Sequence, residues 1–354
     1  MFLVNDHASK TPSKKKISMV KKIFSKILHS FSIFIIIFLS FETVASARST
    51  TLTGAKTIKK ADFDGDGSGA TDDTDEYTIN RGVATKFDVE DDENFDIVSI
   101  LISGGGSGIS AVTIEADSVA LARDLKVTGT ITSAVAGAHT FAVDSFLTLA
   151  AASVETTGTL TFNVASSVGV VFAGTGDSVV MAGKFSGAGD LTLTNSREFT
   201  GVVDTTGEIA VASGKVITFN SGANFTNGSV ISGDGGVTKT GSGTLLLDDT
   251  STFTGDLTVN GGKVDMDGTL ANTVDVVVSN NAGSIYEVGA ADTILSLALA
   301  GTNSSVILTD ALTVGDSNAK TIAGTISGAG ALIKQGTGEY TITAAQTFTG
   351  DLTI

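Results

Sequence analysis

The sequence of 354 residues contains no cysteine and no tryptophan, and its single proline is Pro12. Without cysteine, the chain forms no disulfide and no thiolate zinc site, so packing alone must stabilise the fold. Of three histidines, only His139 lies beyond residue 47, and a Ser-His-Asp triad would have to use it. No G-x-S-x-G motif precedes His139, and its neighbours have the pattern of a strand. These absences argue against nucleophilic and zinc-dependent catalysis.

Basic residues are also scarce. The chain has 22 Lys and Arg against 38 Asp and Glu, which gives a formal net charge of −16. Such a surface repels nucleic acids and anionic lipid headgroups, so we expect no nucleic-acid partner. No Walker-type motif occurs, and the glycine-rich run at 103–108 lacks the strand-then-helix context of a nucleotide loop. We therefore expect no required cofactor and no catalytic site.

The N-terminus has the order of a secretory signal. Residues 14–26 are basic, residues 31–41 are apolar, and Ala45 and Ala47 have the small-x-small spacing of a cleavage site. The apolar run is shorter than the roughly 20 residues that a transmembrane helix needs. We predict that residues 1–47 form a signal-peptide helix that is cleaved near Ala47, and that the remainder is exported.

Glycine is abundant, with 42 residues, and hydrophobic residues make up 42% of the chain. This hydrophobic content excludes a disordered chain, and the mixture of Val, Ile, Thr and Gly suits short strands joined by turns. Apolar and polar residues alternate around residues 253–267, and the apolar set is Phe253, Leu257, Val259, Val264 and Met266. Alternation with a period of two predicts strands with one buried and one exposed face.

A 29-residue segment occurs twice. Residues 231–259 and 326–354 share 14 of 29 positions without gaps, and a shorter version at 185–201 keeps S-G-x-G and F-T-G. The shared residues of the first copy are Ile231, Ser232, Gly233, Gly235, Lys239, Gly241, Gly243 and the run Thr252–Thr258. Repetition on this scale indicates a stacked architecture in which each copy is one rung.

Two all-β folds fit this pattern. One is a right-handed parallel β-helix with coils of about 20–25 residues, and the other is a row of β-sandwich domains of about 100 residues. The extra copy at 185 and the lack of Pro and Trp favour the β-helix. We predict a signal peptide at 1–47, an acidic N-terminal segment at 48–95 and a β-helix repeat region at 96–354.

The repeat resembles the autotransporter-associated β-strand repeat of type V secreted proteins. That family combines a glycine-rich turn, apolar-x-Lys-x-Gly-x-Gly, T-[FY]-x-G and a strand ending in G-x-[LV]. Here these features fall on Gly233, Gly235, Val237, Lys239, Gly241, Gly243, Leu245, Leu247, Thr252, Phe253, Gly255, Leu257 and Val264. The resemblance covers 231–264 and 326–354, and more weakly 185–201.

The resemblance implies an autotransporter passenger, which the export and outer-membrane translocation machinery delivers to the bacterial cell surface through a C-terminal barrel. No barrel pattern is present, and the sequence stops at Ile354 within a strand. We therefore expect a fragment or a truncated passenger. The predicted function is a non-enzymatic structural or adhesive role, with an unknown host or cell-surface ligand; a non-functional remnant is an alternative.

The acidic run DFDGDGSGATDDTDE is the sharpest local cluster. Asp62, Asp64 and Asp66 occupy positions 1, 3 and 5 of a calcium loop, Gly67 permits its turn, and Asp73 falls at position 12. The pattern predicts one Ca²⁺ site, although position 12 is ordinarily Glu and no helices flank the loop. A solvated acidic loop is the alternative.

The same run also resembles the G-D-G-x-x-D-D-T opening of polysaccharide-degrading β-helix proteins. This resemblance implies a second function, a β-helical glycan-degrading enzyme. Basic residues are too sparse for a convincing lyase site, so the non-enzymatic passenger is favoured.

Overall fold

In the computed structural model, the residues that can be described are the strands between 49 and 173, residue 166, and residues 179–354 except 228. The predicted signal peptide lies outside them. Residues Ala47–Ile354 form one compact unit, and it is this unit whose strands are described below. The part of the chain that the structure describes contains no helix long and apolar enough to cross a membrane.

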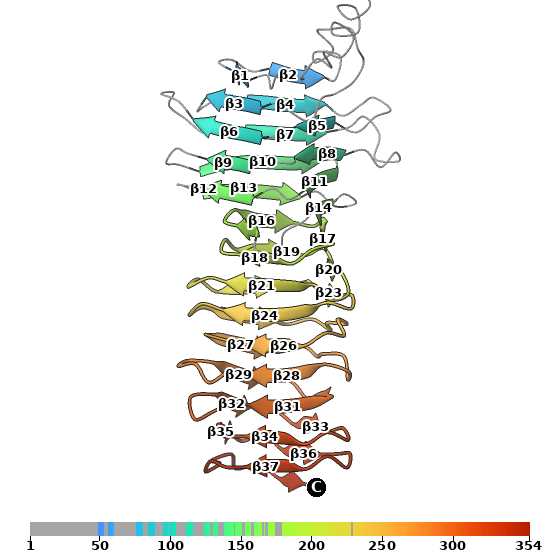
Figure 1. The fold of residues 1–354 in the computed structure, drawn as a ribbon, viewed down its shortest axis with the longest axis vertical. Helices are drawn as coiled ribbons and strands as arrows, with labels where there is room; N and C mark the ends of the chain where they lie inside the picture. The colour runs from blue at the N-terminus through green and yellow to red at the C-terminus, as the bar shows by residue number, and fades with distance from the viewer. Residues whose placement is uncertain are drawn as a thin grey trace, which may run out of the picture. The chain divides into compact units, whose positions relative to one another are not determined.

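Every described ladder joins parallel strands, and every strand inside a sheet pairs with strands one coil earlier and one coil later, whereas the end strands pair on one side (Figure 1). The first face is a single sheet of 14 strands. Its strands are β1 (Ser49–Leu52), β3 (Glu76–Asn80), β6 (Ser99–Ser103), β9 (Thr130–Ser133), β12 (Ser153–Thr156), β15 (Val179–Met181), β18 (Arg197–Phe199), β21 (Val216–Asn220), β24 (Gly236–Thr240), β26 (Leu257–Val259), β28 (Asp275–Val278), β31 (Ser296–Leu299), β34 (Lys320–Ile322) and β37 (Tyr340–Ile342).

The second face consists of a seven-stranded sheet followed by a six-stranded sheet. The seven strands are β2 (Lys56–Lys59), β4 (Ala84–Asp88), β7 (Ala111–Glu115), β10 (Ala138–Asp144), β13 (Thr159–Val164), β16 (Lys184–Gly187) and β19 (Val203–Thr205). The six are β22 (Phe225–Asn227), β25 (Thr244–Leu247), β27 (Lys263–Met266), β29 (Ile285–Val288), β32 (Ser305–Leu308) and β35 (Thr325–Gly328). The two sheets meet where β19 contacts β22.

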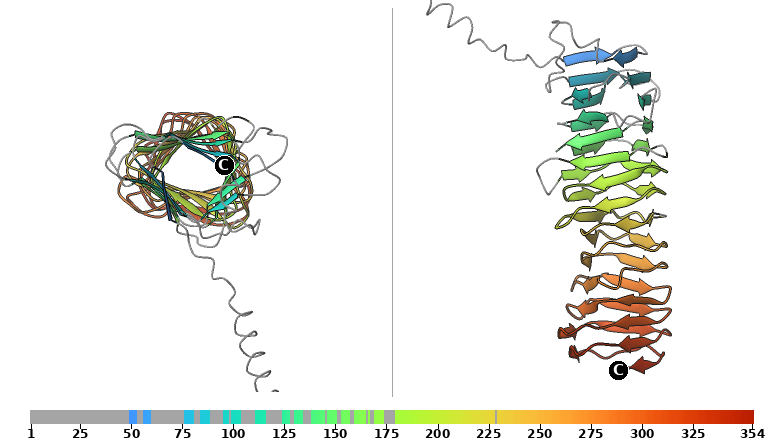
Figure 2. Two further views of the ribbon diagram at one scale, coloured as in Figure 1. Left: turned by 90° about the horizontal axis from the view of Figure 1, so that it is seen from above. Right: turned by 90° about the vertical axis from the view of Figure 1, so that its right-hand side faces the viewer.

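The third face is likewise divided, into a seven-stranded and a four-stranded sheet. The seven strands are β5 (Phe95–Ile97), β8 (Asp124–Val127), β11 (Phe146–Ala150), β14 (Gly169–Ala173), β17 (Asp190–Leu193), β20 (Ile209–Val211) and β23 (Ile231–Ser232). The four are β30 (Asp292–Ile294), β33 (Leu312–Val314), β36 (Leu332–Lys334) and β38 (Leu352–Thr353). Seen along the stack, the coils enclose a common interior (Figure 2).

Coil length follows from the register. Val237 pairs with Leu257 on the next coil, 20 residues later, whereas Ile100 pairs with Ile131, 31 residues later. The predicted coil of about 20–25 residues therefore holds in the C-terminal half and is too short for several N-terminal coils, which carry longer connections between their strands.

The interior is a continuous column of apolar side chains. The residues predicted to face inward are fully buried: Phe253, Leu257, Val259, Val264 and Met266. The residues between them on β26 and β27 are partly exposed. The period-two prediction is confirmed at these positions.

Aromatic rings fill the middle of the column. Phe162 stacks on Phe185 with ring centroids 4.7 Å apart, and Phe185 meets Phe199 edge-on at 5.5 Å. Phe219 continues the series, 6.4 Å from Phe199 and 5.2 Å from Phe225. Because stacked and edge-on aromatic pairs add to the free energy gained by burial, this series stabilises the contact between successive coils.

The structure confirms the predicted parallel β-helix and excludes the row of β-sandwiches, because sandwich sheets are antiparallel. The handedness of the coils stays a prediction. The described strands of the predicted acidic segment, β1 to β4, pair within the same faces as the later strands.

Candidate functional site

The repeated segment makes a contact between two successive coils. In the first copy, Phe253 N–H donates to Ile231 O at 3.2 Å and Thr254 N–H donates to Gly233 O at 2.9 Å. In this contact, Gly255 lies directly against Gly235, and a Cβ on Gly255 would be 2.5 Å from the Gly235 backbone. The T-F-T-G half of the motif on one coil therefore hydrogen-bonds to its I-S-G-x-G half on the preceding coil.

The second copy repeats this two-coil contact. Phe348 N–H donates to Ile326 O at 3.2 Å, and Thr349 N–H donates to Gly328 O at 2.8 Å. A Cβ on Gly350 would lie 2.1 Å from the backbone oxygen of Gly330. The prediction that each copy is one rung is wrong, because the motif joins two rungs.

Both copies contain the pattern Lys-x-Gly, and the structure explains why. Lys239 is fully buried at an inward position of β24, and its ammonium donates to the backbone oxygens of Thr240 and of Gly241, the latter at 3.0 Å. Gly241 has φ +67°, a left-handed conformation that glycine adopts without strain. Burial lowers the pKa of Lys239 to about 8.

Lys334 makes the same contacts in the second copy. It donates to the backbone oxygens of Gln335 and Gly336, and Gly336 has φ +68°. The motif lysine therefore closes the turn that follows its strand. It binds carbonyl groups of its own chain, which gives the recurring lysine a structural role.

The two copies lie on different faces. The Lys239 strand, β24, belongs to the first face, whereas the Lys334 strand, β36, belongs to the third. The following strands, β25 and β37, lie on the second and first faces. The motif thus specifies a turn and an inter-coil contact and leaves the choice of face to the coil lengths between copies.

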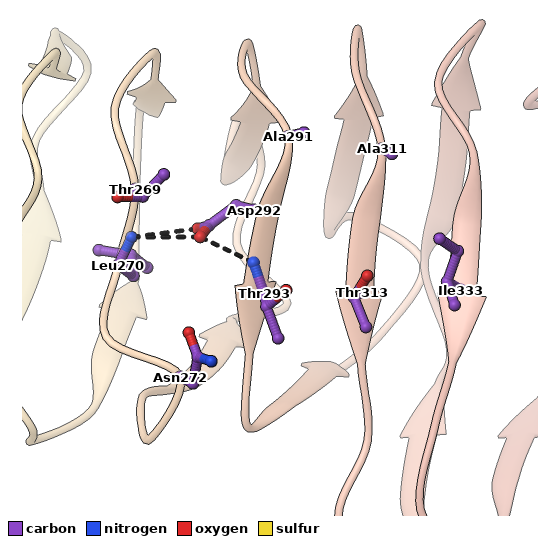
Figure 3. Close-up of a pocket in the computed structure, with 9 residues that line it drawn as sticks. All are labelled: Thr269, Leu270, Asn272, Ala291, Asp292, Thr293, Ala311, Thr313 and Ile333. Atoms are coloured by element: carbon purple, nitrogen blue, oxygen red, sulfur yellow. Dashed lines mark hydrogen bonds between the residues drawn. The ribbon is translucent and has the colours of Figure 1, made fainter.

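A groove lies on the third face, where the regular ladder is interrupted. Between β23 and β30 this face is linked through an isolated bridge between Thr250 and Thr269. The groove has a volume of about 460 Å³ and begins beside β30. It is lined by Thr269, Leu270, Asn272, Ala291, Asp292, Thr293, Ala311, Thr313 and Ile333 (Figure 3).

Asp292 lies between the coil of Leu270 and strand β30 in this groove (Figure 3). The residue is 7% exposed. Leu270 N–H donates to its two carboxylate oxygens at 3.3 and 3.2 Å, and Thr293 N–H donates at 2.8 Å. Burial raises the pKa of Asp292 to about 6, while these backbone donors oppose the shift. The carboxylate takes the place of a ladder carbonyl at the interruption.

Tyr286 lies in the core near Asp292. It is fully buried, and its hydroxyl has no hydrogen-bond partner among the residues that the structure describes. Burial raises the pKa of Tyr286 above its ordinary value, and the charge of Asp292 raises it further. The tyrosine is therefore neutral throughout the range in which Asp292 titrates.

The groove floor follows from the strand register. Thr293 pairs with Thr313, and Thr313 pairs with Ile333, so these outward side chains form one row across β30, β33 and β36. Ala291 and Ala311 lie beside the row (Figure 3). Because alanine is small, the floor is low and flat at this place. Among the lining residues, Asp292 alone is ionisable.

The sequence-predicted calcium ligands Asp62, Asp64, Asp66 and Asp73 lie outside the described residues, so this site stays a prediction. His139 lies on β10, as its strand-like neighbours predicted. Sequence reasoning missed Asp292. Its signal was available, because alternation in the run A-D-T-I-L places Asp292 on the same inward face as Ile294.

The fold places the chain in the class of parallel β-solenoid proteins, which are built from stacked coils. Its C-terminal region then matches a family model, the passenger-associated-transport-repeat, at residues 237–265 and 332–354. These segments contain both lysine-closed turns. Comparisons with curated proteins and with solved structures found no match. The repeat match and the solenoid fold support an autotransporter passenger, as the resemblance implied.

Proposed function

We propose that the chain is the non-enzymatic passenger of an autotransporter, presented on the bacterial surface to bind other cells or surfaces. The main support is the match of the chain to the passenger-associated repeat. The two repeat copies also make the same contacts between coils of the solenoid. Every described ladder joins successive coils, so such a fold can form coil by coil. This property suits a chain that emerges sequentially from a translocation pore.

The groove supports the non-enzymatic role. Hydrolysis of a glycosidic bond ordinarily uses two carboxyl groups on either side of the bond. Asp292 has no second ionisable partner among the lining residues, and its oxygens are engaged by two backbone N–H groups. The polysaccharide-degrading alternative therefore gains no support from this groove.

The test of export joins the full chain to an autotransporter barrel in a bacterial host. We expect antibody labelling of intact cells, protease sensitivity on intact cells, and a mature N-terminus at Arg48 by mass spectrometry. Cells that display the chain should also adhere to host cells more than cells that display the barrel alone. Retention in the cytoplasm with residues 1–47 still attached would contradict export.

We also propose that the loop containing Asp62, Asp64, Asp66 and Asp73 binds one Ca²⁺, because these carboxylates have the spacing of hard-oxygen ligands. Calorimetric titration of the full chain with Ca²⁺ should show one site. The double variant Asp62→Asn, Asp64→Asn should lose it. Absence of heat in the unaltered chain would rule out the site.

A further inference from the structure

The third-face groove offers a platform for a flat ligand. Thr293, Thr313 and Ile333 lie on adjacent parallel strands, which are about 4.8 Å apart. Ala291 and Ala311 keep the surface beside them low. A ligand with a repeating, flat apolar face can therefore rest on methyl groups along the row.

Polar groups accompany this apolar floor. The Thr293 and Thr313 hydroxyls can donate and accept, and the exposed Asn272 provides an amide on the preceding coil (Figure 3). Asp292 faces inward and already accepts hydrogen bonds from two backbone N–H groups, so it is not part of this outward polar set.

The charges limit the kind of ligand. Asp292 is the single ionisable lining residue and the chain has a net charge of −16, which disfavours phosphate, sulfate and carboxylate groups. A cationic ligand is also disfavoured. Asp292 is 7% exposed, so an ammonium would lose most of its hydration to reach one carboxylate that already has two donors.

We propose that the groove binds a short, neutral, β-linked oligosaccharide, with the apolar faces of its sugar rings on the threonine row and its hydroxyls hydrogen-bonded to the Thr293 and Thr313 hydroxyls and the Asn272 amide. A volume of about 460 Å³ falls within the range of about 300–1,000 Å³ for small-ligand sites. The repeat of a β-linked hexose chain is close to the strand spacing, so successive rings meet successive strands. Its use in adhesion rests on the proposed passenger function.

The test is binding by the purified full chain, measured by calorimetry and by saturation-transfer NMR. The probes are cellotetraose as the neutral saccharide, tetragalacturonate as an acidic saccharide and tetralysine as a basic peptide. Ala311→Trp fills the groove from the solvent side. The matched control is Ala298→Trp, because Ala298 is an outward alanine of β31 on the first face.

We expect saturable binding of cellotetraose, little binding of tetragalacturonate, and an affinity loss of about tenfold or more in Ala311→Trp. Ala298→Trp should bind as the unaltered chain does. The inference is overturned if the chain does not bind cellotetraose, if both variants bind equally, or if tetralysine binds more tightly. Because the assay uses purified protein, each outcome is independent of whether the chain is exported.

Discussion

At the scale of the residue, outward positions on a strand accept polar and charged side chains, whereas inward positions accept them only with hydrogen-bond partners. Val259 is buried at 0% exposure in β26, whereas its neighbour Thr258 faces outward. Where a polar side chain does face inward, as Lys239 and Asp292 do, it binds backbone groups at a turn or at an interrupted ladder. Burial of an unpartnered charge costs several kcal/mol, which explains why these inward polar residues have backbone partners.

Val259→Asp should therefore lower the free energy of unfolding by several kcal/mol, about 3 or more. Thr258→Asp is the matched control and should change it by no more than about 0.5 kcal/mol. Thermal melting followed by circular dichroism measures both. Equal losses in the two variants would contradict the assignment of inward and outward faces on β26.

The pKa of Asp292 predicts a dependence of stability on pH. Its pKa is raised to about 6 in the folded chain from 3.8, so the folded state binds the proton more tightly than the unfolded state does. The contribution of Asp292 to stability therefore increases as the pH falls from 7 to 4. Neutral Tyr286 does not titrate in this range.

Asp292→Asn should remove this contribution while keeping an acceptor for Leu270 N–H. Relative to the variant, the unaltered chain should gain about 1–2 kcal/mol of stability between pH 7 and pH 4. Urea denaturation of both proteins at several pH values gives the difference. A difference that is constant over the range, or that changes in the opposite direction, would show that Asp292 titrates as an exposed carboxyl.

At the scale of the element, the sequence predicts strands and turns better than it predicts faces. Alternation located β26 and β27, and the repeated glycines located their turns. The face on which each copy lies was not predictable, because all three faces require the same backbone conformation, a short parallel strand. The interruption between β23 and β30, and with it the groove, depends on the summed lengths of several coils and not on a local motif.

The pair Gly235 and Gly255 in the two-coil contact is predicted to stabilise the packing of the two coils. Gly255→Ala places a Cβ 2.5 Å from the Gly235 backbone, so the two coils must separate, and we expect a loss of about 1–3 kcal/mol. Gly222→Ala is the matched control, since its Cβ would lie 3.5 Å from the Ser242 hydroxyl and make ordinary contact. Equal melting temperatures for the two variants would show that the contact does not hold the coils together.

At the scale of the whole Ala47–Ile354 unit, the central claim is a stack of parallel coils in which residues one coil apart, 20 positions for Val237 and Leu257 and 31 for Ile100 and Ile131, are neighbours. Local propensities alone do not establish this stacking. The repeat and the lack of Pro and Trp favoured it over separate sandwiches, and the parallel ladders confirm it. The first face is continuous through all its strands, whereas the other two faces are each divided into two sheets.

Cysteine pairs test this claim most directly, because the natural chain contains no cysteine. Thr238 and Thr258 are outward register partners on β24 and β26, within the Cα separation of about 4.4–6.8 Å that a disulfide spans. Thr238 and Val277 lie two strands apart, at about 9–10 Å. The stacked-coil account predicts that Thr238→Cys, Thr258→Cys forms an intramolecular disulfide on mild oxidation and that Thr238→Cys, Val277→Cys does not. Failure of the first pair, or equal crosslinking of both, would contradict it.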